Sequence, residues 1–411
     1  MADTVLASLF NWLDNSPTPF HVVETSRARL LGGGFVQQAT FSEPLASRGF
    51  YCVDGAVIAW VIGEAPAPLR IVGAHTDSPN FRIQPLPDVV SSGWSQLGVE
   101  IYGGVLVNSW LDRDLGLAGR VIDAEGHQKL FAVHEPLARI PQLAIHLDRE
   151  VNERGLLLDR HQHTVPIWGV DAPVFSEWLS SVSGMNNVVS FDAHLFDVQK
   201  SAVLGVDSSL IASGRLDNQL SCWAAITSLL DSSSSSRTCI AILNDHEEVG
   251  SESVTGAAGP LLETFLSVLA SQQGLTPGDV HHLYSDSWCL SADNAHAVHP
   301  NYRERHESKH APLPNRGVAL KLNGNQRYAT SARGAAFIKT VADRNDVPLQ
   351  TFVSRNNMPC GSTIGPITAT KLGIEAIDVG VPQLSMHSAR EMCGAQDPQN
   401  LLNLMNGFYR S

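Results

Sequence analysis

The stretch Thr238-Cys-Ile-Ala-Ile-Leu-Asn-Asp-His-Glu-Glu248 passes from a short apolar run into five consecutive polar residues. A short apolar run with β-branched residues is typical of a buried strand. A second run, Leu69–Ala74, has the same character and leads directly into His75-Thr76-Asp77. In open α/β sheets, ligands gather where the strands end at their carboxyl edge. The two stretches therefore predict an α/β fold with its functional site at that edge.

Helical segments alternate with strands on both sides of the middle of the chain. Their apolar residues recur at helical spacing, and glycine or proline ends several of them. This alternation is typical of a mainly parallel sheet with helices on its faces. Helices are expected at Val5–Leu13, His21–Leu31, Arg215–Leu230, Pro260–Ala270 and Gly334–Asn345, and two more strands at Ala56–Ile62 and Ile374–Val379.

The region between residues 90 and 200 has a different character. It is rich in short strand-like runs and turn residues and shows little helical periodicity. We predict that residues 91–200 form a β-rich insert domain and that residues 1–90 and 201–411 form one discontinuous catalytic domain. The serine run Ser232–Ser236 is expected to be a solvated loop. Within the insert, strands are expected at Val99–Tyr102, Val105–Val107, Gly119–Ile122 and Leu130–Val133.

The composition limits the classes of function. The 411 residues include 28 Lys and Arg against 41 Asp and Glu, for a formal charge of −13. This charge disfavours nucleic acid and anionic membranes as partners. We find no apolar window long enough for a membrane span and no basic segment typical of a secretory signal near Met1. The six cysteines form no C-x-x-C pair, so a cytoplasmic protein with buried thiols is expected.

Five clusters of histidine and carboxylate residues suggest a metal centre. Two divalent cations about 3.5–4 Å apart need a shared carboxylate as well as separate ligands. Each residue also has an ordinary interpretation: Asp217 could cap the helix that it begins, and Asp293 could form a turn with its own backbone. The candidate ligands are His75, Asp217, Glu248, Asp293 and His387, with Asp217 as the bridge.

The adjacent pair Glu247-Glu248 is the most informative local feature. Two neighbouring carboxylates repel each other, and a cation on one of them relieves the conflict. The other carboxylate is then free to act as a general base. The alternative is a solvated acidic turn. Asp77 lies two residues after His75, on the same side of an extended segment, and is expected to orient the imidazole.

Other hydrolytic chemistries fit the sequence less well. His246-Glu247-Glu248-Val249-Gly250 ends in glycine where the helical single-zinc motif H-E-x-x-H needs a second histidine. Gly361-Ser-Thr-Ile-Gly365 has threonine at the position where a nucleophile elbow has serine. The sequence contains neither a G-x-G-x-x-G motif nor a phosphate-binding P-loop.

At these motifs the chain resembles the aspartyl aminopeptidase family of co-catalytic zinc metallopeptidases. The match runs over nearly the whole chain, with long motifs in the same order. They include Ser16-Pro-Thr-Pro-Phe-His21, Gly73-Ala-His-Thr-Asp-Ser-Pro79, Leu143-Ala-Ile-His-Leu147, Arg215-Leu-Asp-Asn218, Asp245-His-Glu-Glu-Val-Gly-Ser251, Ser291-Ala-Asp-Asn-Ala-His296 and Met386-His-Ser-Ala-Arg-Glu-Met392.

The resemblance implies a zinc-peptidase α/β/α catalytic domain interrupted by a β-rich insert. It implies the same five metal ligands, with Glu247 as general base and Asp77 as the residue that orients His75. His146 in the insert looks like the histidine that family members lend to a neighbouring subunit, where it would stabilise the oxyanion. The family assembles as tetrahedral homo-dodecamers.

The implied reaction is removal of an N-terminal residue, typically Asp or Glu in this family, by a metal-bridging hydroxide. Lys321 aligns with a lysine of the family's specificity pocket, and His299 is expected nearby. The cofactors would be two divalent ions, Zn²⁺ first, with Co²⁺ or Mn²⁺ also compatible with these ligands. A branch of the family prefers apolar N-terminal residues. A deacylase or carboxypeptidase of this fold, a catalytically silent metal-binding scaffold and a structural protein with acidic loops remain alternatives.

Overall fold

The computed structural model describes residues 2–233 and 236–411, so Ser234 and Ser235 of the predicted serine loop lie outside the described residues. A nine-stranded sheet forms the centre of the catalytic unit, and its four central strands are parallel to one another. In spatial order the strands are β1 (Val36–Gln37), β2 (Arg48–Val53), β3 (Ala56–Val61), β13 (Thr238–Asn244), β4 (Leu69–His75), β14 (Trp288–Ala292), β18 (Glu375–Gly380), β16 (Val318–Leu322) and β17 (Leu349–Val353).

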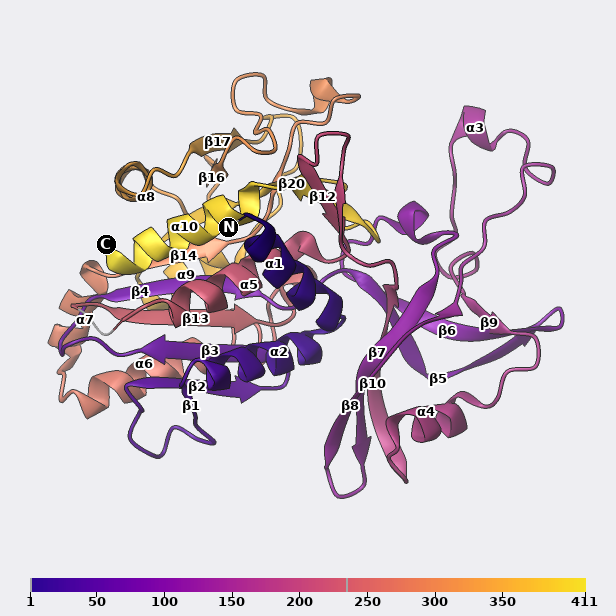
Figure 1. Cartoon of the computed structure of the whole chain (residues 1–411), viewed down its shortest axis with the longest axis horizontal. Helices are drawn as coiled ribbons and strands as arrows, with labels where there is room; N and C mark the ends of the chain where they lie inside the picture. Colours follow the sequence, from indigo (N-terminus) through magenta and orange to yellow (C-terminus); the bar gives the residue numbers. More distant parts are fainter. Residues whose placement is uncertain (1, 234–235) are drawn as a thin grey trace.

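Both faces of this sheet are buried under helices (Figure 1). Successive residues of β3 point to opposite cores: Val57 packs in one, and Ile58 packs in the other. The expected α/β/α architecture with a mostly parallel sheet is therefore confirmed. One face carries α1 (Ala2–Asn15), α2 (Pro19–Gly32), α5 (Leu216–Leu230), α8 (Ala332–Arg344) and α10 (Asp397–Arg410), and the other carries α6 (Leu261–Gln272), α7 (Pro277–Ser285) and α9 (Ile364–Leu372).

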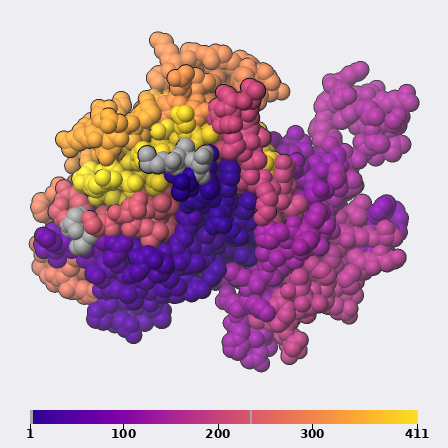
Figure 2. All heavy atoms as spheres, viewed as in Figure 1, coloured from indigo at the N-terminus to yellow at the C-terminus, as the bar shows by residue number. Residues whose placement is uncertain are grey.

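The β-rich region forms a second lobe beside the catalytic unit (Figures 1 and 2). Its six-stranded sheet is antiparallel throughout and packs around a core of its own that includes Phe81, Leu117 and Phe175. Figure 1 also shows an arm with α3 (Val151–Arg154) that projects from the lobe. The lobe contains β8 (Gln128–Ala138), β7 (Leu115–Asp123), β10 (Val188–Asp197), β5 (Asn80–Ser91), β6 (Trp94–Tyr102), β9 (Ile167–Gly169) and α4 (Phe175–Ser183).

The lobe's sheet begins earlier than the expected insert. Strand β5 starts at Asn80 and runs across the division expected after residue 90, so the two domain boundaries stay a prediction. The strand expected at Val105–Val107 is wrong. Gly103 turns the chain with a φ of 73°, and the segment then enters a 3₁₀ turn at Val107–Trp110.

A smaller five-stranded sheet lies near the junction of the two lobes (Figure 1). All its strands come from the part of the catalytic sequence that follows the insert, and the loop with His387 lies between its last two strands in chain order. Its strands are β11 (Ala202–Leu204), β12 (Leu210–Ser213), β20 (Glu391–Gly394), β19 (Pro382–Leu384) and β15 (Ala295–His296). In the described parts of the chain, no helix is long and apolar enough to cross a membrane.

Candidate metal centre

The five predicted ligands meet at one place. His75 is the last residue of β4, Asp293 follows β14 directly, and Asp217 lies in the first turn of α5. Glu248 follows β13 in a 3₁₀ turn, Glu247–Val249, and His387 lies between β19 and β20. All five line a cavity of about 190 Å³ at the carboxyl ends of the central strands, as the topology of an open α/β sheet predicts.

Asp217 belongs to two groups of potential ligands. In one group, its carboxylate, His75 and Asp293 each offer an atom within 4.8 Å of the others; in the second, Asp217, Glu248 and His387 do the same. Its Oδ1 lies 3.5 Å from His75 Nε2, and its Oδ2 lies 3.4 Å from His387 Nε2. The two oxygens of one carboxylate thus face two different histidines.

The residues present fit divalent cations. Asp217 Oδ1 is buried and makes no hydrogen bond, which is costly for a carboxylate oxygen unless a cation meets it. The donor set consists of imidazole nitrogens and carboxylate oxygens, which suit zinc and its neighbours in the first transition row. The helix-cap alternative for Asp217 lacks support, because no side-chain hydrogen bond caps the start of α5.

Burial disfavours the charged forms of several carboxylates at the centre. Burial and the surrounding carboxylates raise the pKa of Glu247 to about 8 and that of Asp293 to about 6. Burial likewise raises the pKa of Glu248 to about 7, with the charge of Asp217 adding to the effect. Burial opposes the charged form of His387, but hydrogen bonds to Asp217 and Glu248 outweigh it and raise its pKa to about 12. A divalent cation would relieve this crowding of carboxylates.

Asp77 holds the turn that carries the glutamate pair. Its Oδ1 accepts the backbone N–H of Glu247 at 3.0 Å, and its Oδ2 accepts the backbone N–H of Glu248 at 3.0 Å. His75 Nδ1 lies 3.3 Å from Oδ1 and 3.0 Å from the main-chain oxygen of Asp77. Burial opposes the charge, but hydrogen bonds from His75, Tyr102 and the Glu248 backbone lower the pKa of Asp77. Asp77 therefore contacts both His75 and the glutamate turn.

Three residues around the centre make contacts that were not predicted. Glu391 accepts the backbone N–H of Asp217 at 2.9 Å and that of His387 at 2.7 Å. The Tyr102 hydroxyl donates to Asp77 Oδ2 at 2.7 Å, and the Gly104 carbonyl lies 3.1 Å from His387 Nδ1. Glu391 lies in a motif that carries the family resemblance, but its position four residues after His387 does not by itself predict a hydrogen bond between the two residues.

The remaining predicted site residues lie in different places. Lys321 lines the cavity together with Tyr328 and His296, neither of which was predicted. His299 instead lines a separate apolar pocket with Leu313, so the structure does not bring it to the centre. His146 is exposed and is not among the residues that line the cavity of its own chain.

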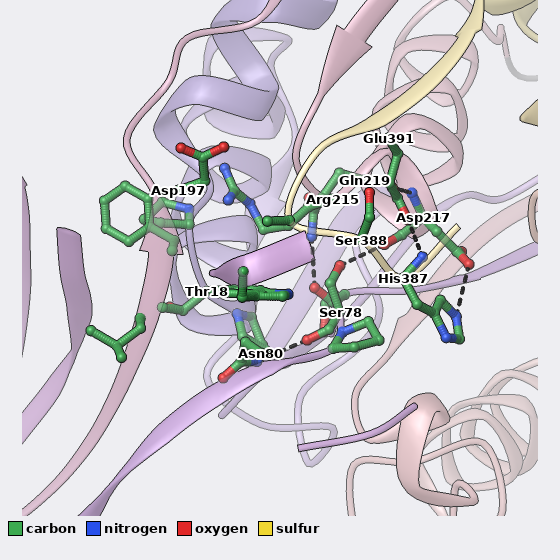
Figure 3. Close-up of a pocket in the computed structure, with 18 residues that line it drawn as sticks. Thr18, Ser78, Asn80, Asp197, Arg215, Asp217, Gln219, His387, Ser388 and Glu391 are labelled. Atoms are coloured by element: carbon green, nitrogen blue, oxygen red, sulfur yellow. Dashed lines mark hydrogen bonds and ion pairs between the residues drawn. The ribbon is translucent and has the colours of Figure 1, made fainter. Parts of the chain in front are cut away.

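A much smaller cavity, of about 20 Å³, lies behind the centre. Figure 3 shows Asp217, His387 and Glu391 on one side of it, with Asn80 and Asp197 of the insert on the other. The half-buried Arg215 also lines it, and its Nε has no hydrogen-bond partner among the described residues. The volume is about that of one water molecule. The back of the metal centre is therefore part of the contact between the two lobes.

Comparison with known proteins agrees with this geometry. A family model described as aminopeptidase I zinc metalloprotease (M18) matches residues 12–409. A curated relative from Streptomyces coelicolor, named as a probable M18 family aminopeptidase 2, is 47% identical over 97% of this chain and 96% of its own length.

Two solved structures have the same fold over the whole chain. A cryo-EM structure of the Ape4 and Nbr1 complex matches with a TM-score of 0.93 and 33% identity, covering 100% of this chain and 86% of that chain. The S. cerevisiae mApe1 dodecamer matches with a TM-score of 0.85 and 27% identity, covering 100% of this chain and 97% of that one. The resemblance seen in the motifs is thereby confirmed at the level of the family, and the chain belongs to the M18 family of zinc metalloproteases as a metallo-aminopeptidase.

Proposed function

We propose that this aminopeptidase removes acidic residues, Asp or Glu, from the N-terminus of peptides, and that it works with two divalent metal ions, Zn²⁺ first among them. The observation that carries the substrate preference is Lys321. It is the only lysine or arginine among the described residues that line the cavity. An acidic substrate side chain would find its one positive partner there, in a chain of net charge −13.

The surroundings of Lys321 favour a role in binding. It lies on β16 and its side chain is 3% exposed, so its charge is held in the cavity wall. Nζ lies 3.7 Å from Asp293 Oδ1 and 5.2 Å from the centre of the Tyr328 ring. A cation bound to Asp293 would offset the negative charge of this carboxylate. The Lys321 ammonium would then be able to attract a substrate carboxylate. A neutral side chain would leave the buried ammonium without a full partner.

The two metal sites proposed here share Asp217. One would be held by His75 and Asp293, and the other by His387 and Glu248. Bound cations would supply Lewis acidity to the scissile carbonyl and to the attacking water. Glu247 also lines the cavity, and its side chain makes no hydrogen bond to any described residue.

Glu247 would act as the general base. Its backbone N–H is held by Asp77. Its carboxylate, His75 and Glu248 each offer one atom that lies within 4.8 Å of the other two. It would take a proton from the attacking water and return that proton to the leaving amine. Its neighbour Glu248 faces His387 instead, with Oε1 at 3.3 Å from Nε2.

A homo-oligomer, most simply a tetrahedral dodecamer, completes the proposal, with His146 acting in a neighbouring subunit. The dodecamer of the S. cerevisiae relative supports it. The insert also exposes many large apolar side chains, which suits burial against further copies. They are Leu86, Val90, Trp94, Leu143, Leu147, Leu157, Val170 and Val174. All six cysteines are free thiols, which supports the proposed cytoplasmic location.

The experiment is a substrate panel on the zinc-loaded Lys321→Met variant, which keeps the length of the side chain and removes its charge. We expect kcat/KM for Asp- and Glu-peptides to fall about 100-fold, in line with loss of a buried charge pair. Leu- and Ala-peptides should change less than about threefold. Zinc content must be measured on the same sample, because Lys321 also contacts Asp293.

The matched control is Lys371→Met, which removes a lysine that donates to the Ala258 carbonyl, away from the cavity. It should leave the whole panel unchanged. Equal losses across the panel for Lys321→Met would contradict the acidic preference. A wild-type enzyme that favours Leu-peptides would support the alternative, an M18 aminopeptidase for apolar N-terminal residues.

A further inference from the structure

The insert returns to the metal centre at the end of its first hairpin. Strand β5 begins at Asn80, three positions after Asp77, and β6 runs back antiparallel to it. The register pairs Asn80 with Tyr102, the last residue of β6. We call residues Tyr102–Leu106 the insert root. Because of this register, the insert root lies directly beside the segment that carries His75 and Asp77.

The first contact of the insert root is the Tyr102 hydroxyl. It donates to Asp77 Oδ2 at 2.7 Å, on the carboxylate that also faces His75 Nδ1. The phenol is buried, and the Arg82 guanidinium lies 5.5 Å from the centre of its ring. Arg82 is itself paired with Asp192 of β10 at 2.7 Å. Side chains of the insert therefore fix the ring that holds Asp77.

The second contact is made by the backbone. The Gly104 carbonyl lies 3.1 Å from His387 Nδ1, and the Leu106 N–H donates to the His387 carbonyl at 2.9 Å. A carbonyl can only accept, so Nδ1 must carry the proton of the neutral ring. Nε2 is then the free nitrogen, and it is the atom that faces Asp217 and Glu248.

The close approach depends on two glycines. Gly103 has a φ of 73°, and a Cβ there would lie 3.1 Å from the Cβ of Glu248. A Cβ on Gly104 would lie 3.1 Å from His387 Nδ1, closer than ordinary contacts allow. Side chains at these positions would push the insert root away from the ligands.

We propose that the insert root is a positioning element of the metal centre. It orients His75 through Asp77 and orients His387 through Gly104, so the two histidines on opposite sides of Asp217 are both held by the insert. The placement of the insert against the catalytic unit thereby tunes metal affinity. This inference rests on the metal sites proposed above.

The test uses the full-length protein and Tyr102→Phe, which removes the hydroxyl and keeps the ring. Zinc dissociation constants are measured by competition with a chromophoric chelator. We expect weaker zinc binding by about 10- to 100-fold, typical when the partner of a metal-bound histidine loses its support. In the zinc-saturated variant, kcat should fall while KM for an Asp-peptide stays within about twofold. The matched control is Tyr409→Phe, a buried tyrosine that donates to the Ile240 carbonyl away from the centre.

A second variant tests the backbone contact. Gly104→Ala should change the visible absorption spectrum of the Co²⁺-substituted protein, because it displaces His387. Gly32→Ala, where a Cβ meets no atom within 4 Å, should leave the spectrum unchanged. Wild-type zinc affinity in Tyr102→Phe together with a wild-type Co²⁺ spectrum in Gly104→Ala would overturn the positioning role. A wild-type protein that binds no zinc would overturn the proposed metal sites, and this inference with them.

Discussion

His75 Nε2 lies 3.5 Å from Asp217 Oδ1, although the whole insert separates the two residues in the chain. Each residue is held by a different element: His75 ends a central strand, and Asp217 begins the helix that covers that strand. The two side chains come close enough to share a cation only when this helix packs against this strand. The geometry of the metal centre therefore depends on the packing of α5 against β4 and on the contact with the insert.

Glu247→Gln should abolish turnover while the protein keeps its metal. The amide preserves the size of the side chain but cannot accept the proton of the attacking water. Removal of a general base typically costs about 10²- to 10⁴-fold in rate. Zinc content, by elemental analysis, and kcat on an Asp-peptide are the two measurements. Turnover within tenfold of wild type would remove Glu247 from the role of base.

Asp217→Asn should weaken both metal sites together. The amide has no charge and offers only one oxygen, so the two histidines lose their common carboxylate. We expect a loss of zinc affinity greater than the about 10- to 100-fold that an outer hydrogen-bond partner contributes. Zinc titration by calorimetry measures it. If one site keeps its affinity, Asp217 serves a single ion and the shared-ligand proposal is wrong.

The metal-free protein should lose stability between about pH 6.5 and pH 8. Burial raises the pKa of Glu247 and of Glu391 to about 8, so the folded chain keeps protons that the unfolded chain releases near 4.5. Their contribution to the free energy of unfolding falls as the pH rises through 8. The raised pKa of His387, caused by hydrogen bonds that outweigh its burial, acts in the same direction above 6.5. Buried His21, whose pKa burial lowers to about 4, opposes this only below 6.5.

Thermal unfolding with a chelator and with excess Zn²⁺, at pH 6.5 and pH 8, measures this effect. The midpoint should fall by a few degrees over this range without metal, and bound Zn²⁺ should remove most of that decrease. Glu247→Gln should show a smaller decrease in the metal-free state, because one titrating group is missing. Parallel curves with and without zinc would contradict the prediction.

Mixed assemblies test the role of His146. Protomers with His146→Ala keep Glu247, and protomers with Glu247→Gln keep His146. If His146 acts in a neighbour, a mixture refolded or exchanged together should recover activity that neither variant has alone. Recovery requires a site with an intact base next to an intact histidine from another subunit. No recovery in verified mixed assemblies would assign His146 to its own chain or to no catalytic role.

Much of the site could be predicted because the residue types themselves carry the chemistry. His75 ends one buried strand and Asp293 directly follows another, the apolar runs of both strands are plain in the sequence, and the parallel topology brings such ends together. Asp217 could be placed at the start of a helix from the pattern that follows it. The alternation of strands and helices was enough to expect the layers that the structure contains.

The contacts around the ligands could not be predicted in the same way. The Tyr102 hydroxyl and the Gly104 carbonyl reach the centre only because of the hairpin register of the insert, and neither residue type signals a metal site. The choice between two histidines three positions apart also depends on tertiary structure. His296 ends β15 and lines the cavity, whereas the chain beyond it turns away and carries His299 to another pocket.

The strands by which the insert leaves and re-enters the catalytic unit are neighbours: β5 and β10 pair, with Arg82 opposite His194. Both connections therefore lie side by side, and the entropy of closing a chain segment between two such points grows only slowly with its length. A foreign module with equally close ends could therefore be grafted there without opening the nine-stranded sheet. Such a chimaera would fold its catalytic half, yet it would lack the phenol that donates to Asp77 and the carbonyl that contacts His387.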